Sequence, residues 1–361
     1  MKYIDSFRDK SLVFALADKI KDTVCKEKVY KIMEICGTHT MTIARFGIKK
    51  LLPENIKLVS GPGCPICVIS QGEIDAIFKV AKNPDVILAT YGDLLKTPGS
   101  NNENLLQARA KGSDIRVIFS PLDVIDIAKN TTKKVIFISI GFETTVPATA
   151  AMILEAKRQN ITNIAIFPYN KTMPAIMKFL LSQSFLDIDG FLCPGNVSVI
   201  TGLDMYRVIS DHKKAAVIAG FEPVDILAAI YRIICQVNEQ VFCVENIYKR
   251  AVSQDGNIKA KKLIDLVFEP SSSLWRGVGF IENSGLALKM TFKEYNILQS
   301  FDIKIESVFD KQGCLCGSVL LGSLEPEDCP LFGRDCSPEL PVGPCMVSSE
   351  GACAARYRYG N

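Results

Sequence analysis

The sequence contains only two histidines, His39 and His212, and one tryptophan. Because imidazole is so scarce, a histidine-rich zinc or di-iron site is excluded, and thiolates must be the main metal ligands. Charge of one sign is not concentrated either, since 42 basic residues face 39 acidic ones and no basic run is interleaved with aromatic residues. This balance argues against a nucleic-acid surface.

Long apolar segments are also missing. The longest apolar runs, such as residues 135–140, have the length of a strand and fall far short of the ~20 residues that a membrane span needs. Residues 1–10 are charged and lack the apolar centre of a signal peptide. We therefore expect a soluble, cytoplasmic protein with no membrane partner.

Cysteine, by contrast, is abundant, with 13 residues. Structural disulfides are rare in the cytosol, so this number favours metal binding or redox chemistry. The odd count also leaves no complete disulfide pairing.

Short apolar stretches alternate with helical patterns over most of the chain. Strands are expected near residues 29–35, 58–60, 86–89, 115–119, 135–140, 164–167, 190–192 and 216–219. Near-continuous apolar strands between helices predict parallel sheets covered on both faces. The fold class is therefore α/β, with two similar lobes expected at residues 30–130 and 133–236.

Residues 1–29 and 240–361 are expected to form a third domain. Residues 5–29 have the apolar spacing of one amphipathic helix, and the serines at 271–273 indicate a loop. A cysteine-dense, proline-punctuated tail follows residue 310, and residues 318–321 are strand-like. Such a tail has little apolar core, so a metal or cluster would have to stabilise it.

Four tail cysteines, Cys329, Cys336, Cys345 and Cys353, are spaced more widely than the C-x2–4-C pairs of zinc ribbons. Four thiolates without histidine suit a [4Fe-4S] cluster or a structural zinc about equally. Cysteines that bind nothing remain a third interpretation. Cys314 and Cys316 are spare candidates for the same site.

Two further cysteines lie in the loop Gly61-Pro62-Gly63-Cys64-Pro65-Ile66-Cys67. Cys64 and Cys67 can form a disulfide, hold a soft metal or exchange two electrons. They can also be small buried apolar residues. The glycines and prolines bend and restrict the backbone here, which favours a functional interpretation.

Cys36-Gly37-Thr38-His39 places a thiol and an imidazole at the end of the first expected strand, before a helix expected from Met41. Such a pair can act as a nucleophile, with the histidine lowering the pKa of the thiol. It can also share a metal with the Cys64 loop. Alternatively, His39 is only a helix-start residue bonded to backbone.

These motifs together resemble the signatures of the HypD family of hydrogenase maturation factors. The resemblance is carried by Cys36-Gly37-Thr38-His39, the Gly61–Cys67 loop, Gly141-Phe142-Glu143-Thr144-Thr145, Cys193-Pro194-Gly195-Asn196-Val197, Cys329-Pro330-Leu331-Phe332-Gly333 and Gly343-Pro344-Cys345-Met346-Val347-Ser348-Ser349-Glu350-Gly351. The similarity spans nearly the whole chain, and it implies two Rossmann-like lobes and a third domain that carries a cluster.

The resemblance implies an iron-binding, redox-active scaffold for [NiFe] hydrogenase rather than an established enzyme. With a HypC-type partner it would assemble the Fe(CN)2CO group, receiving cyanide from a HypE-type donor. Cys36 would ligate transient Fe(II), Cys64 and Cys67 would act as ligands or as a redox dithiol, and His39 would be a nearby polar partner. Cys329, Cys336, Cys345 and Cys353 would hold a [4Fe-4S] cluster.

Two other functions share parts of this pattern. A stand-alone iron–sulfur disulfide oxidoreductase would use the tail cluster and the Cys64–Cys67 pair without a HypC-type partner. A nucleotide-binding α/β protein with structural zinc is the other, although no G-x-G-x-x-G or Walker A motif is present.

Overall fold

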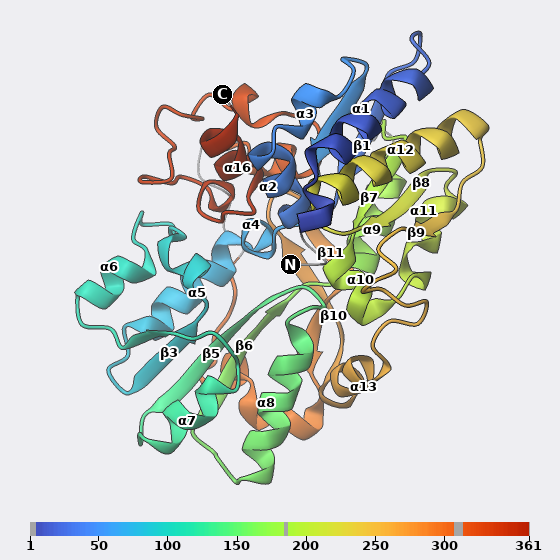
Figure 1. Cartoon of the computed structure of the whole chain (residues 1–361). Helices are drawn as coiled ribbons and strands as arrows, with labels where there is room; N and C mark the ends of the chain where they lie inside the picture. Colours follow the sequence, from blue (N-terminus) through green and yellow to red (C-terminus); the bar gives the residue numbers. More distant parts are fainter. Residues whose placement is uncertain (1–4, 184–186, 307–312, 361) are drawn as a thin grey trace.

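Two parallel sheets form the framework of the computed structural model, which describes residues 5–183, 187–306 and 313–360 (Figure 1). The first sheet has the order β2-β1-β7-β8-β9 and the second has the order β4-β3-β5-β6. Their strands are β1 (Tyr30–Glu34), β2 (Ile56–Ser60), β3 (Val86–Thr90), β4 (Ile115–Val117), β5 (Lys134–Gly141), β6 (Ile164–Asn170), β7 (Gly190–Pro194), β8 (Ala215–Ala219) and β9 (Val244–Asn246). The predicted α/β class with two Rossmann-like lobes is confirmed.

The two sheets do not follow the expected division into residues 30–130 and 133–236. β1 lies between β2 and β7, with Ile32 opposite Gly190, whereas the chain after β2 continues into the other sheet. An apolar pattern identifies a strand but does not specify its neighbour, so the order of lobes could not be read from it. The chain therefore crosses between the lobes after β2 and again after β6.

Helices cover both faces of each sheet. They are α1 (Lys10–Thr23), α2 (Gly37–Arg45), α3 (Ile48–Leu51), α4 (Pro65–Val68), α5 (Gln71–Ala81), α6 (Leu105–Ala110), α7 (Asp123–Lys129), α8 (Val146–Arg158), α9 (Met173–Ser182), α10 (Gly195–Thr201), α11 (Arg207–Asp211), α12 (Pro223–Glu239), α13 (Ile258–Val267) and α14 (Ile297–Ser300). Short 3-10 segments are η1 (Asp5–Phe7), η2 (Gly92–Lys96), η3 (Asp204–Tyr206) and η4 (Met290–Tyr295). In β3, Ile87 packs with α7 and α8 while the next residue, Leu88, faces the core that contains α5.

The N-terminal helix belongs to the first lobe and not to a third domain. α1 packs along α12, and Ile20 shares a buried core with Tyr30 and Ile230. The helix is also shorter than the expected residues 5–29. It begins after Asp9, whose carboxylate accepts hydrogen bonds from the first free backbone N–H groups, and it ends at Thr23.

An antiparallel hairpin, β10 (Phe268–Trp275) and β11 (Gly279–Leu288), lies between the lobes and was not expected. The serines at 271–273 are strand residues, so the loop prediction is wrong. A buried lysine fastens this hairpin, because Lys171 Nζ lies 2.7 Å from Glu73 Oε1 and donates to the Leu274 carbonyl at 2.9 Å. The hairpin, α5 and the end of β6 are thereby held together.

The tail at residues 313–360 contains only short elements. They are α15 (Cys316–Leu320), η5 (Pro326–Asp328), η6 (Pro344–Met346) and α16 (Ala352–Tyr359). The strand expected at residues 318–321 is therefore a helical turn. α16 packs on α2 of the first lobe. Within the described residues, no helix combines the length and apolar character needed to cross a bilayer.

Candidate functional site

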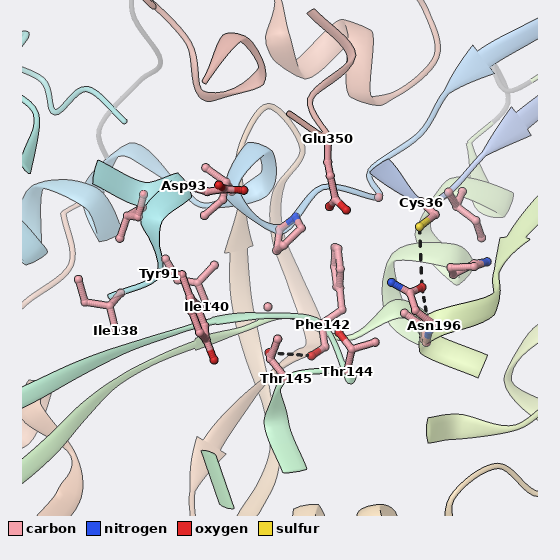
Figure 2. Close-up of a pocket in the computed structure, with 18 of the residues that line it drawn as sticks. Cys36, Tyr91, Asp93, Ile138, Ile140, Phe142, Thr144, Thr145, Asn196 and Glu350 are labelled. Atoms are coloured by element: carbon pink, nitrogen blue, oxygen red, sulfur yellow. Dashed lines mark hydrogen bonds between the residues drawn. The ribbon is translucent and has the colours of Figure 1, made fainter. Parts of the chain in front are cut away.

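A cavity of about 260 Å³ lies where the carboxyl ends of the two sheets meet (Figure 2). Cys36 follows β1 and Asn196 follows β7, while Tyr91 follows β3 and Phe142 follows β5. In the first sheet the strand order reverses between the neighbours β1 and β7. In the second sheet it reverses between β3 and β5. The cavity thus joins two topological switch points, which is where open α/β sheets bind ligands.

Cys36 forms the buried end of this cavity. Its side chain is 4% exposed, and Sγ lies 3.8 Å from Asn196 Oδ1. Cys36 is the residue before α2, which begins at Gly37 and not at Met41 as expected. Burial raises the pKa of the Cys36 thiol to about 12, and the nearby Glu350 adds to the effect. A bound cation would favour the thiolate instead.

The Cys64 loop touches the Cys36 loop directly. Gly37 N–H donates to the Gly63 carbonyl at 3.1 Å, and a Cβ on Gly63 would lie 2.3 Å from Cys36 N. Cys64 and Cys67 are joined by a disulfide, with their Cα atoms 5.2 Å apart, and both are buried at the start of α4. Three of the predicted site cysteines therefore lie on two adjoining loops.

His39 does not join them. It is fully buried in the first turn of α2, where Nε2 lies 2.9 Å from the Gly220 carbonyl and the ring lies 5.0 Å from that of Phe221. Since a carbonyl only accepts, the proton must be on Nε2. Burial lowers the pKa of His39 to about 4. The imidazole is neutral and does not line the cavity, in keeping with the alternative of a helix-start residue bonded to backbone.

Two carboxylates line the cavity that were not assigned as site residues from the sequence. Asp93 lies in η2, just after β3, and Glu350 reaches in from the tail. Thr38 Oγ1 donates to Glu350 Oε1 at 2.6 Å, and burial raises the pKa of Glu350. Asp93 could have been found from its place directly after a strand, and Glu350 from its place inside a conspicuous tail motif.

Glu143 lies between two residues of the cavity wall, Phe142 and Thr144, but its own side chain does not line the cavity. Its Oε1 accepts the Met173 N–H at 2.9 Å at the start of α9, and its Oε2 is buried without a partner. Burial raises the pKa of Glu143 to about 7. The next residues, Thr144 and Thr145, do line the cavity.

The tail thiols gather in a second place. Cys316, Cys345 and Cys353 interact with one another, and the contacts with Cys316 and Cys345 lower the pKa of Cys353. Cys314 contacts Cys316. Cys329, Cys336 and Cys353 line one small cavity with Cys314 and Cys316, so six thiols lie around the region where four were expected.

The donor set of this region is sulfur on an apolar wall that includes Leu331, Phe332 and Met346. Thiolates without histidine or carboxylate are the ligands of iron–sulfur clusters, so the residues fit such a group. Among the residues that the structure describes, no three His, Cys, Asp or Glu side chains are arranged to hold a single metal ion.

The two regions share one segment of chain. A Cβ on Gly351 would lie 2.1 Å from the Cys345 carbonyl, and a Cβ on Gly37 would lie 2.6 Å from Glu350 Cβ. The residues between Cys345 and Cys353 therefore touch the thiol cluster on one side and the Cys36 loop on the other.

Comparison with known proteins agrees with this arrangement of motifs. The family model described as "HypD: Hydrogenase formation hypA family" matches residues 11–360. The chain is 44% identical to hydrogenase maturation factor HypD2 of Bradyrhizobium diazoefficiens, over 100% of this chain and 97% of that protein. It is 42% identical to HypD of Azotobacter vinelandii, with 100% and 97% covered. It is 40% identical to HypD of Escherichia coli (strain K12), with 99% and 98% covered. The chain belongs to the HypD family of hydrogenase maturation factors.

Proposed function

We propose that this chain holds an iron ion at Cys36 while the Fe(CN)2CO group of [NiFe] hydrogenase is assembled on it. The observation that carries the proposal is the position of the Cys36 thiol, buried at the end of a cavity where two sheet edges meet. Thiolate is a soft ligand that suits low-spin Fe(II) bearing cyanide and carbon monoxide. A single thiolate leaves the other coordination positions open for those ligands.

Partners complete the proposed site. A HypC-type protein would supply a second thiolate across the cavity, and a HypE-type protein would deliver cyanide. The cavity suits such an arrangement, because it opens between the lobes while its floor is shielded from bulk water.

The residues around Cys36 prepare it for this role. Burial keeps the thiol protonated, so it binds iron only by releasing its proton. The S–H group can donate to Asn196 Oδ1, which lies 3.8 Å from Sγ. The disulfide of Cys64 and Cys67 lies on the adjoining loop, and its reduction to two thiols would provide additional ligands beside Cys36.

We also propose that the tail binds a [4Fe-4S] cluster through Cys329, Cys336, Cys345 and Cys353, with Cys314 and Cys316 close enough to replace two of them. When bound, such a cluster supplies one-electron transfer. The thiols themselves hold η6 and α16 together in a segment with little other regular structure.

The test compares two buried cysteines on neighbouring strands, Cys36 just after β1 and Cys193 within β7. Cys36→Ala and Cys193→Ala variants are purified anaerobically with the HypC-type partner, and iron, sulfide and the infrared bands of metal-bound cyanide and carbon monoxide are measured. We expect Cys36→Ala to lose the bands and the extra iron while keeping cluster iron, and Cys193→Ala to keep both. Retention of the bands in Cys36→Ala would refute the proposal.

A stand-alone disulfide oxidoreductase is the second candidate, favoured by the disulfide itself. Thiol–disulfide exchange needs access to a sulfur atom, yet Cys64 is 3% exposed and Cys67 is 0% exposed. We therefore expect no turnover of a small disulfide by the chain alone with a one-electron reductant. Steady turnover that is abolished by Cys67→Ser would favour this second function.

A further inference from the structure

Two carboxylates and one thiol form a row from the mouth of the Cys36 cavity to its buried end. Asp93 is exposed at its mouth, Glu350 is half-buried, and Cys36 is buried. Figure 2 shows the Glu350 carboxylate between the other two side chains. Neighbours in this row also interact electrostatically. The charge of Asp93 acts on Glu350, and the charge of Glu350 acts on Cys36.

This acidic lining has no positive counterpart. Of the described residues that line the cavity, none is Lys, Arg or His. Two carboxylates that share a cavity repel each other, and a cation between them removes that cost. An anion in the cavity would increase the repulsion. Walls of low dielectric constant concentrate the negative potential toward the floor and raise the local concentration of cations.

We propose that Asp93 and Glu350 form the path by which iron reaches Cys36, capturing it as an aquated divalent cation. This inference rests on the proposed function. Carboxylate oxygens suit an aquated ion, whereas the thiolate is the softer, final ligand. At the floor one Fe–OH2 bond breaks and one Fe–S bond forms, the thiol proton leaves to water, and iron remains Fe(II).

The substrate class follows from the same charges. Aquated Fe(II) carries two positive charges and each bound cyanide cancels one, so the two carboxylates attract the aquated ion more strongly than a cyanide complex of iron. Glu350 is a positioning residue as well, since Thr38 fixes it at the start of α2.

The test uses Co2+ as a redox-stable probe and the cluster-loaded chain. Stopped-flow absorption follows the thiolate-to-cobalt band in the wild type, in Asp93→Asn, in Glu350→Gln and in the double variant. Gln keeps the oxygen that accepts from Thr38, so the loop is preserved. Glu282→Gln, at an exposed residue of β11, is the matched control.

We expect the double variant to bind Co2+ about tenfold more slowly at low ionic strength and to lose the salt dependence of the rate. The final band at saturating Co2+ should be unchanged, because Cys36 is intact. A rate within about twofold of the wild type would overturn the inference. If Glu350→Gln does not fold, Asp93→Asn alone should slow binding about threefold, and an unchanged rate would likewise overturn it.

A Cys36→Ala variant separates this inference from the proposed function. A wild-type band that Cys36→Ala abolishes, formed at an unchanged rate in the double variant, refutes only the approach path. A wild-type band that persists in Cys36→Ala refutes metal binding at Cys36 itself.

Discussion

The chain holds its two groups of thiols in opposite ways. Cys36 stands at the junction of β1 and α2, and its loop is pressed against Gly63 so closely that a methyl group would not fit. The tail thiols stand on short turns between residues 313 and 360, and they gather around one another on an apolar wall. The first thiol is placed by the fold, whereas the others help to create the fold around them.

This difference suits the two proposed tasks. A site that takes up and releases iron must keep its geometry when empty, so its frame has to be rigid without the metal. A resident cluster never leaves, so its binding energy can replace a hydrophobic core.

The largest effect is expected in the tail. Cys345→Ser removes the thiol that contacts both Cys316 and Cys353. Loss of ligation of the proposed cluster should raise the rate of protease cleavage within residues 313–360 about tenfold or more, while the lobes stay resistant. Limited proteolysis with mass spectrometry measures this under anaerobic conditions. Cys235→Ser, at a buried cysteine of α12, is the control, and equal cleavage in both variants would contradict the prediction.

The next effect concerns the frame of the cavity. Lys171→Met leaves the Glu73 carboxylate buried without its cation and should lower the free energy of unfolding by about 3–5 kcal/mol. Urea unfolding measures the loss. Lys178→Met, at an exposed residue of the following helix, should change stability by less than about 0.5 kcal/mol. Adding Glu73→Met to Lys171→Met should restore part of the loss, and no recovery would argue against a buried-charge origin.

A smaller effect is expected where the two loops touch. Gly63→Ala would push a methyl group against the Cys36 backbone and should destabilise the protein by about 2–3 kcal/mol. Gly92→Ala is the matched change, because its added Cβ would meet only Val117 at 3.9 Å. Urea midpoints of the two variants test the difference. Equal midpoints would show that the two loops can move apart, and the frame around Cys36 would then not be the rigid one that distinguishes it from the tail.

The last effect depends on pH and is similar in size. In the folded protein burial raises the pKa of Glu143 from the ordinary value of 4.5 to about 7, so the carboxyl keeps its proton at mildly acidic pH. The contribution of Glu143 to the free energy of unfolding should therefore be greatest below pH 4.5, and it should be lost as the pH rises through 7. Glu143→Gln has no proton to lose, so its stability relative to the wild type should rise by about 2–3 kcal/mol between pH 4.5 and pH 8. A pH-independent difference would contradict this.

Much of the lobe framework could be predicted, because its determinants are local. The helix over Gln71–Ala81 and the strand at residues 86–89 follow from apolar periodicity and from the glycine, proline and threonine loops beside them. The loops that carry Cys36, Cys64 and Asn196 could be placed at strand ends for the same reason. Sequence patterns thus found most of the cavity wall before the cavity itself was known.

What escaped prediction depends on distant partners. Nothing in residues 30–60 shows that β1 will pair with β7, and nothing in Glu269-Pro270-Ser271 shows the alternation of a strand. Lys171 looks like an ordinary surface lysine until Glu73 and the hairpin enclose it. His39 looked like a partner of Cys36 by spacing, but the start of a helix at Gly37 carries it to the Gly220 carbonyl.

The strand order also has a consequence for biosynthesis. β1 and β2 leave the ribosome early, but the neighbour that makes them part of a sheet, β7, begins only at Gly190. Two strands alone are marginally stable, so this pair has to wait. At ~5–20 residues per second the delay is on the order of ten seconds. During that interval the thiols of Cys36, Cys64 and Cys67 lack their native enclosure, and the nascent chain is at its most sensitive to oxidants and stray metal ions.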